Sequence, residues 1–402
     1  MCSSESGETM AQSIRIPVKR EILEWVIQHA GVNLNEKWQK TMTPWLKGEK
    51  NPTLVQLEQL SKTAQVPFGY FFLKEPPVEN IPLLKFRTVN NDDIQTPSRN
   101  LIDTIHDMEV KQAWLSDYRQ QQGMSKNFFV GQGQSVRQLN SDKQAEAVMA
   151  MLGIKSGWNY RRGELNRFEV LRTKLDEIGV TVMYNNQVND NTRRRLDQNE
   201  FRAFALIDDY APLIFINSND SFSAKLFSLV HETVHVWFGT AELLNGDLEV
   251  TPKTRDPITE QRINQITENI LFPAALFEKQ WFMTKTTDTI QKCLELSKPF
   301  GTSSLAVAIR AKRMGFLTQR DIDKLKEYLT DQYLRTKAEN KKRTIHLNPY
   351  RLKAARIDKS FARDVYLGTR SGALAYSEAF ELVNVKSSAG FDKLMNYVKG
   401  VN

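Results

Sequence analysis

Two histidines in this chain stand four positions apart around a glutamate, in the segment His231-Glu232-Thr233-Val234-His235. Positions i and i+4 lie on one face of a helix, so both imidazoles can hold a single metal ion. Glu232, directly after the first histidine, can then reach a metal-bound water as general base. The alternative is a pair of half-buried histidines that cap a core helix. Because the chain has only five histidines, the spacing favours a metal site.

A catalytic zinc site needs a third protein ligand and an open position for water. The next predicted helix offers two carboxylates for this role, Glu260 and Glu268. Glu260 shares a helix face with Asn264, and Glu268 extends that face by another turn. The spacing favours Glu260 and leaves Glu268 as the alternative. The non-functional interpretation of both residues is a pair of solvent-exposed helix charges.

Several predicted elements must position these residues. Apolar runs at residues 201–207 and 212–217, on either side of a polar turn, indicate a β-hairpin. The polar residues from Asn217 to Asp220 can cap the helix that carries the two histidines. Helical periodicity at 258–272 predicts the second helix, which ends before Pro273. Residues 168–184 predict a helix that is broken at Gly179 and leads into a strand.

The N-terminal part of the chain predicts a separate helical unit. Apolar residues recur at helical spacing from Ile22 to Ile27, and Leu54, Leu57 and Leu60 are expected on the inward face of a later helix. Between them, residues 34–40 and 44–48 indicate two short helical pieces. Residues 100–122 predict one long amphipathic helix after a proline-containing linker.

The composition excludes several classes of protein. With 402 residues, 41% hydrophobic and 25% charged, the chain has the length and balance of a globular protein with two to four domains. Cys2 and Cys293 are its only cysteines, so any zinc must be held by histidine and carboxylate. The N-terminus lacks the features of a signal peptide, and no apolar run reaches the length of a membrane span. We therefore expect a cytoplasmic protein without a membrane partner.

The net charge of +8 is concentrated in one region. Residues 310–370 contain 17 Lys and Arg against 7 Asp and Glu, a net of 17 − 7 = +10, which leaves 8 − 10 = −2 for the rest. Such a region can attract nucleic acid through its phosphates. A solvated helical surface is an equally good interpretation.

The stretch from Phe201 to Pro273 resembles the ImmA/IrrE-type metallopeptidases. The residues that carry the resemblance are the hairpin ending in Ile216-Asn217, the histidine-bearing helix, and a second helix with Glu260, Asn264 and a terminal Leu271-Phe272-Pro273. The chain departs from the family pattern at three positions, Ile263, Ile266 and Glu268. The resemblance implies a zincin-like domain with a small β-sheet, His231, His235 and Glu260 as metal ligands, and amide hydrolysis with Glu232 as general base. We expect zinc as the cofactor, with manganese as the alternative.

The N-terminal unit resembles an Xre-type helix-turn-helix domain, on the following residues: Leu23-Glu24-Trp25, Gly31, Trp45 to Glu49, Pro52-Thr53-Leu54, Gln56 to Leu60, and the later Lys85-Phe86-Arg87. The spacing from Gly31 to Trp45 is shorter than in the Xre pattern. The interpretation therefore stays open between a DNA-binding domain and a degenerate one used for folding or for partner binding. The candidate DNA contacts are Lys40, Thr43, Lys47, Lys50 and Asn51.

These observations predict an α+β, mostly helical fold with the following organisation: a disordered tail (1–14), the helix-turn-helix domain (15–78), the metallopeptidase domain (79–290) and a helical basic C-terminal region (291–402). The first functional hypothesis is a regulatory zinc endopeptidase that cleaves one specific protein, such as a transcriptional repressor or a toxin. The second is a DNA-binding regulator or antitoxin that uses the peptidase fold as a scaffold or sensor. Oligomeric state, activating signal and cleavage site do not follow from the sequence.

Overall fold

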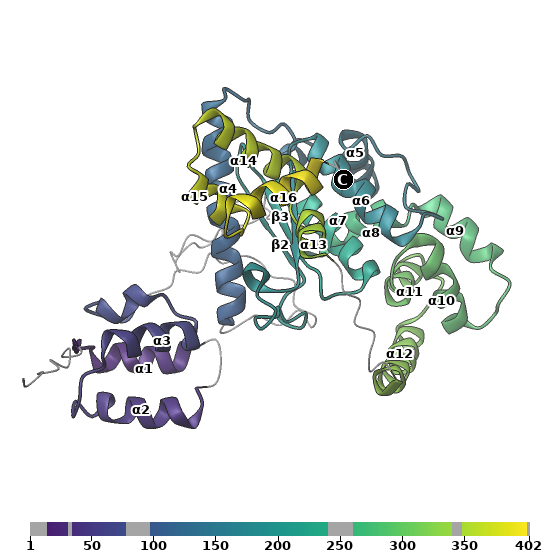
Figure 1. The fold of residues 1–402 in the computed structure, drawn as a ribbon. Coiled ribbons are helices and arrows are strands. Elements are labelled where there is room, and N and C mark those ends of the chain that lie inside the picture. Colours follow the sequence, from purple (N-terminus) through teal and green to yellow (C-terminus); the bar gives the residue numbers. More distant parts are fainter. Residues whose placement is uncertain (1–13, 31–33, 78–96, 240–259, 340–347, 400–402) are drawn as a thin grey trace, which may run out of the picture. The chain divides into compact units, whose positions relative to one another are not determined.

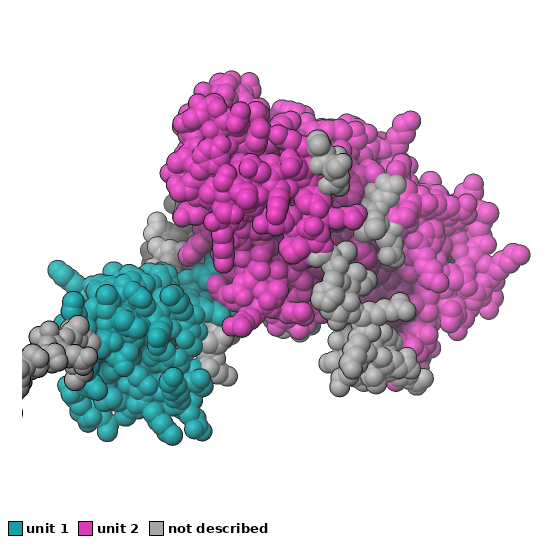
Figure 2. Space-filling model, in the orientation of Figure 1, with its two compact units in different colours: residues 1–81, 96–103 teal, residues 82–95, 104–402 magenta. Residues whose placement is uncertain are grey.

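The computed structural model describes residues 14–30, 34–77, 97–239, 260–339 and 348–399. These residues form two compact units (Figure 2), the first within 1–81 and 96–103 and the second within 104–402. The chain is mostly helical with one small sheet (Figure 1), so the α+β fold class is confirmed. Residues 1–13 of the predicted disordered tail, Gly31 and Lys85-Phe86-Arg87 lie outside the described residues. None of the described helices is long and apolar enough to cross a membrane.

The described part of the first unit contains three complete α-helices and one 3-10 helix, α1 (Arg20–His29), α2 (Glu36–Leu46), α3 (Leu54–Ala64) and η1 (Phe68–Phe72), and the first residues of a long helix, α4 (Arg99–Gln121), that continues into the second unit. Ile22, Leu23 and Val26 are fully buried in its core, as the spacing predicts. The prediction that Leu54 lies on the inward face is wrong, because 38% of its surface is exposed; Ile27, the last residue of the apolar pattern in α1, is 44% exposed. Leu54 is the first residue of α3 and lies beyond the stripe that the rest of the helix packs into the core.

The two short helical pieces predicted between α1 and α3 are a single helix, so that prediction is wrong. α2 continues through Pro44, although proline has no N–H to donate to the preceding turn. Pro44 stands in the last turn of α2, where Met42 and Trp45 are buried on either side of it. Packing of these two side chains therefore outweighs the missing hydrogen bond.

The second unit is built around a three-stranded sheet with the order β1-β3-β2. The predicted hairpin is confirmed: β2 (Ala203–Leu206) and β3 (Leu213–Asn217) pair antiparallel, and both strands are entirely buried. The predicted strand after Gly179 is β1 (Thr181–Asn185), and Gly179 adopts a left-handed φ of 77° at the end of the preceding helix. β1 pairs parallel to β3, a pairing that the sequence did not predict.

Helices surround this sheet. Five of them precede or carry the predicted metal ligands along the chain: α4 (Arg99–Gln121), α5 (Ser141–Met151), α6 (Glu164–Glu177), α7 (Phe222–Phe238) and α8 (Glu260–Leu271). The remaining α-helices are α9 (Ala274–Met283), α10 (Thr289–Phe300), α11 (Ser304–Arg313), α12 (Gln319–Glu339), α13 (Pro349–Arg356), α14 (Lys359–Ser371), α15 (Tyr376–Leu382) and α16 (Ser388–Lys399). Short 3-10 helices η2 (Gln132–Val136) and η3 (Val188–Asp190) complete the unit. The described residues of the predicted C-terminal region lie in the same compact unit as the sheet, and the boundary at residue 290 stays a prediction.

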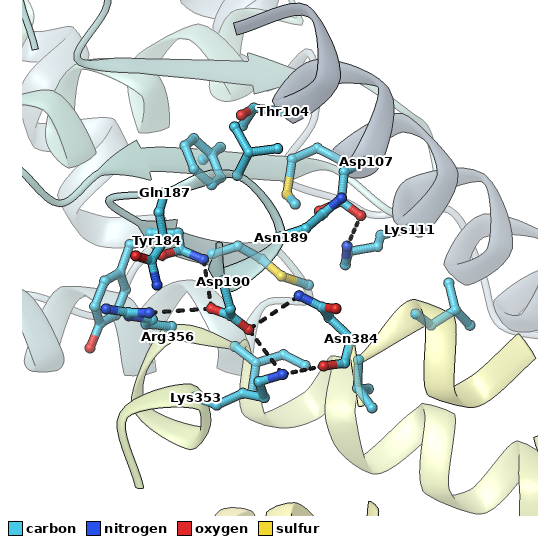
Figure 3. A pocket seen from close by; sticks show the side chains of 18 residues that line it. Thr104, Asp107, Lys111, Tyr184, Gln187, Asn189, Asp190, Lys353, Arg356 and Asn384 are labelled. Atoms are coloured by element: carbon cyan, nitrogen blue, oxygen red, sulfur yellow. Dashed lines mark hydrogen bonds and ion pairs between the residues drawn. The ribbon is translucent and has the colours of Figure 1, made fainter. Parts of the chain in front are cut away.

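A cluster around Asp190 ties the C-terminal helices to the end of β1. Its carboxylate pairs with Lys353 at 2.9 Å and Arg356 at 3.2 Å, both on α13. The side-chain amides of Asn185 and Asn384 also donate to it, at 3.0 and 3.3 Å. Figure 3 shows Lys353, Arg356 and Asn384 converging on Asp190 in the wall of a pocket with about 530 Å³ of empty space, part of which is open to solvent. Segments far apart in sequence are thereby held together by one carboxylate.

Candidate metal centre

The histidine-bearing helix α7 has strong local signals at both ends. Ser221 caps its start, with its Oγ accepting the N–H of Ala224 at 3.2 Å. The cap predicted between Asn217 and Asp220 is wrong, because the side chain of Asn217 instead accepts the N–H of Asn219 and donates to the carbonyl of Phe201. Gly239 ends the helix with a left-handed φ of 62°.

Burial of α7 increases towards its C-terminal half, where the motif lies. Every residue from Ser228 to Phe238 is buried, and the helix packs against β2, β3, α6 and α8 (Figure 1). His231 and His235 are therefore held in the interior rather than at a solvated surface. The ring of Phe227 lies 6.3 Å from that of His231 in a stacked arrangement, a contact that the i, i+4 spacing could have revealed.

The structure brings the three predicted ligands together. His231 Nε2 lies 3.1 Å from His235 Nε2. Glu260, the first residue of α8, places Oε1 at 3.1 Å from His231 Nε2 and Oε2 at 3.4 Å from His235 Nε2. Within the described residues, these three form the group whose possible ligand atoms all lie within 4.8 Å of one another.

This donor set fits a catalytic metal. Two imidazoles and one carboxylate are a ligand combination of hydrolytic zinc sites, and they leave a coordination position open. Both histidines point the same ring nitrogen, Nε2, at the carboxylate. The two histidines are buried and the side chain of Glu260 is 42% exposed, so the three ligand atoms that converge from two helices can hold a metal ion that solvent reaches from the side of Glu260. The geometry does not determine which ion is held.

The electrostatics at Glu260 favour its negative form. Burial acts to raise the pKa of this carboxyl, but hydrogen bonding and charge interaction with His231 and His235 outweigh it and hold the pKa far below its usual range. Asn264, one turn further along α8, places its side-chain amide 3.5 Å from Glu260 Oε1. The predicted common face of Glu260 and Asn264 is therefore present.

Glu268, the alternative third ligand, has a different environment. Its carboxylate is buried and pairs with Arg313 of α11 at 2.9 Å. The residue after Glu268, Asn269, accepts a hydrogen bond from Arg310, also of α11. These contacts tie α8 to α11 and give Glu268 a structural role, and it is not in the three-residue group.

Glu232 follows His231 on α7 and is 3% exposed. A buried carboxylate at this position is what the general-base role requires, and the role itself stays a prediction. Three further polar residues of the second unit have structural contacts. Tyr184 packs against Phe168 and the Arg172 guanidinium, Arg202 pairs with Asp220 at 3.3 Å, and Asn217 is buried in the contacts described above.

The candidate DNA contacts all lie in the first unit and are exposed to solvent. Lys40 and Thr43 are on α2, Lys47 caps its end, and Lys50 and Asn51 follow in the connection to α3. Thr43 Oγ1 donates to the carbonyl of Gln39, and Lys40 and Lys47 form only long ion pairs with neighbouring glutamates, at 3.9 and 4.0 Å. Their contact with DNA stays a prediction.

The comparison with known families concerns the second unit. The model of peptidase family M78, described as an IrrE N-terminal-like domain, matches residues 175–312. The matched range includes the two histidines, Glu232 and Glu260, and supports the peptidase part of the resemblance found in the sequence. No curated protein and no solved structure matches the chain. Residues 175–312 are therefore similar to a peptidase family for which a metal is implied.

Proposed function

We propose that this protein is a metal-dependent endopeptidase with a regulatory role, whose metal ligands are His231, His235 and Glu260. The observation that carries the proposal is the convergence of both Nε2 atoms on the carboxylate of Glu260 at 3.1 and 3.4 Å. Zinc suits two imidazoles and a carboxylate, and manganese is the alternative. The match of residues 175–312 to a peptidase family supports peptide hydrolysis as the reaction class.

When bound, the metal supplies Lewis-acid activation of water and of the scissile carbonyl. Glu232 accepts the proton of the attacking water and passes it to the leaving amine. Burial of α7 around Glu232 keeps bulk water away from this proton transfer. The two histidines and Glu260 hold their positions because α7 and α8 are packed against each other.

The substrate in this proposal is one specific protein, such as a DNA-binding repressor or a toxin, as the resemblance to ImmA/IrrE-type peptidases implies. A matched pair of strains expressing the wild type and Glu232→Gln tests it by mass spectrometry of protein N-termini. We expect a new N-terminus in the wild type alone, with cleavage by the variant reduced about 10²- to 10⁴-fold. Identical N-termini in both strains, with both proteins folded and loaded with metal, would contradict peptidase activity.

A DNA-binding regulator is the second candidate function. It is supported by the exposure of Lys40, Thr43, Lys47, Lys50 and Asn51 on one small helical unit. Binding to the DNA upstream of its own gene should weaken steeply with salt, and Glu232→Gln should leave it unchanged. Absence of salt-sensitive binding at low ionic strength would remove this candidate.

A further inference from the structure

A pocket separate from the metal ligands lies where the start of α7 meets the end of α10. It contains about 720 Å³ of empty space, part of which is open to solvent, and lies within the size range of small-molecule sites. Its polar and charged lining consists of Arg167, Ser221, Ser223, Ser297, Lys298 and Thr302. All of these residues belong to the second unit.

The charged side chains among the described lining residues are both positive. Arg167 and Lys298 face the pocket, and no carboxylate is among the described residues that line it. Asp220, directly before the α7 cap, is not among these residues; its carboxylate accepts the N–H of Ser221 at 2.8 Å and pairs with Arg202 at 3.3 Å. The pocket therefore has the charge that an anion requires.

Arg167 is held in a fixed position against the backbone. Its guanidinium is buried and donates to the carbonyls of Asn159 at 2.7 Å and Pro299 at 2.9 Å. A Cβ atom at Gly301 would lie 2.1 Å from Arg167 Nη1, and Gly301 has a left-handed φ of 68°. Only glycine lets the guanidinium approach the end of α10 this closely.

The start of α7 adds hydrogen-bond donors to the same pocket. The first N–H groups of a helix, here those of Phe222 and Ser223, have no acceptor within the helix. The next N–H, of Ala224, is taken by Ser221 Oγ. At the start of a 17-residue helix, these donors and the helix dipole favour a phosphate or a carboxylate.

Thr302 provides an independent indication of a ligand. Its side chain lines the pocket, it is only 5% exposed, and its Oγ1 has no hydrogen-bond partner in the described part of the chain. A buried hydroxyl without a partner is unfavourable and is uncommon in folded proteins. A ligand oxygen in the pocket would satisfy it.

We propose that this pocket binds a small molecule that carries a phosphate group, with Arg167, Lys298, Thr302 and the first turn of α7 as its recognition elements. The ligand would contact the same helix that carries His231, nine residues or about 13 Å further along its axis. The site neither includes nor requires the metal ligands.

Isothermal titration calorimetry on the full chain, at fixed ionic strength in chloride, tests the proposal with two separate probes, inorganic phosphate and adenosine monophosphate. We expect Thr302→Val, which keeps the shape of the side chain, to raise Kd about tenfold. Lys298→Ala should raise Kd several-fold, whereas Lys279→Ala, the same charge change on an exposed residue of α9, should not. Tighter binding of adenosine monophosphate than of phosphate assigns the site to an organic phosphate, and equal binding assigns it to the phosphate group alone.

Failure of both probes to bind at about 10 mM would overturn the proposal. Equal Kd values in the wild type, Thr302→Val and Lys298→Ala would also overturn it. Glu260→Ala removes a metal ligand, so loss of phosphate binding in that variant would place the anion at the metal centre and refute a separate site. If Thr302→Val does not fold, the two lysine variants test the proposal, and equal Kd values for Lys298→Ala and Lys279→Ala would overturn it.

Discussion

Substitution of Asp190 by Asn should release the C-terminal helices from the sheet. Asp190 pairs with both Lys353 and Arg356, and these three side chains are 24%, 18% and 20% exposed. Removing one partner of a buried ion pair costs about 3–5 kcal/mol because the remaining charges lose their compensation. Since the cluster is partly solvated, and Asn keeps one acceptor oxygen, we expect a loss near the lower end, about 3 kcal/mol.

Urea unfolding measures this loss, and hydrogen–deuterium exchange locates it. Exchange should increase in α13 and in residues 185–190 more than in α7. Asp323→Asn on the exposed face of α12 removes the same charge without an ion-pair network and serves as the control. An unfolding free energy for Asp190→Asn within about 0.5 kcal/mol of that control would refute the reasoning.

The carboxylate of Asp190 should also make the unfolding free energy depend on pH. Burial acts to raise the pKa of Asp190. The positive charge of Lys353 and the hydrogen bonds from Lys353 and Asn185 outweigh burial, so the pKa is lower than the ordinary 3.8. A depressed pKa gives stability that is present above about 3.8 and is lost as pH falls through the lower, folded-state value. The difference in stability between wild type and Asp190→Asn should therefore shrink in acid. A difference that stays constant down to pH 2 would contradict this interpretation.

Three further predictions concern buried groups of the second unit. Burial raises the pKa of Asp358 to about 6, so its contribution to stability is present below 3.8 and is lost as pH rises through about 6. Between pH 4.5 and 7.5, the urea midpoint of the wild type should therefore fall by more than that of Asp358→Asn. An equal fall in both proteins would refute this prediction. Burial also raises the pKa of Cys293 to about 12, so iodoacetamide at pH 8 should alkylate Cys293 only after unfolding. Peptide mapping distinguishes Cys293 from Cys2, and modification of Cys293 in the native protein at a free-thiol rate would contradict this. Glu268→Gln should cost about 3 kcal/mol by breaking the pair with Arg313, yet retain the metal, and loss of the metal in a folded variant would return Glu268 to the ligand set.

The sequence predicts the local parts of the site well because they depend on short-range geometry. His231 and His235 share a face through helix periodicity alone, and the antiparallel hairpin before them follows from alternating apolar runs and a polar turn. The start of α7 was misplaced because Asn217 and Ser221 are both good caps, and only the tertiary contacts of Asn217 decide between them.

Long-range packing accounts for the rest of what was missed. The spacing favours Glu260 over Glu268, and the structure brings Glu260 to the two histidines; the pair of Glu268 with Arg313 of a later helix has no sequence signature. The parallel pairing of β1 with β3 and the attachment of α13 through Asp190 join segments separated by many residues. The sequence predicts a helix boundary at Pro44 because the penalty for proline inside a helix is local, whereas the burial of Trp45, which offsets it, depends on tertiary packing.

Metal content measured by mass spectrometry, on full-length protein purified without added metal, tests the central claim most directly. The variants to compare are His235→Ala, Glu260→Ala and, as a control on the same helix, Glu268→Gln. We expect about one zinc or manganese ion per chain in the wild type and in Glu268→Gln, and loss of the ion in the other two variants. A wild type that holds no metal, even after reconstitution with zinc and with manganese, would contradict the metal centre and the peptidase function built on it.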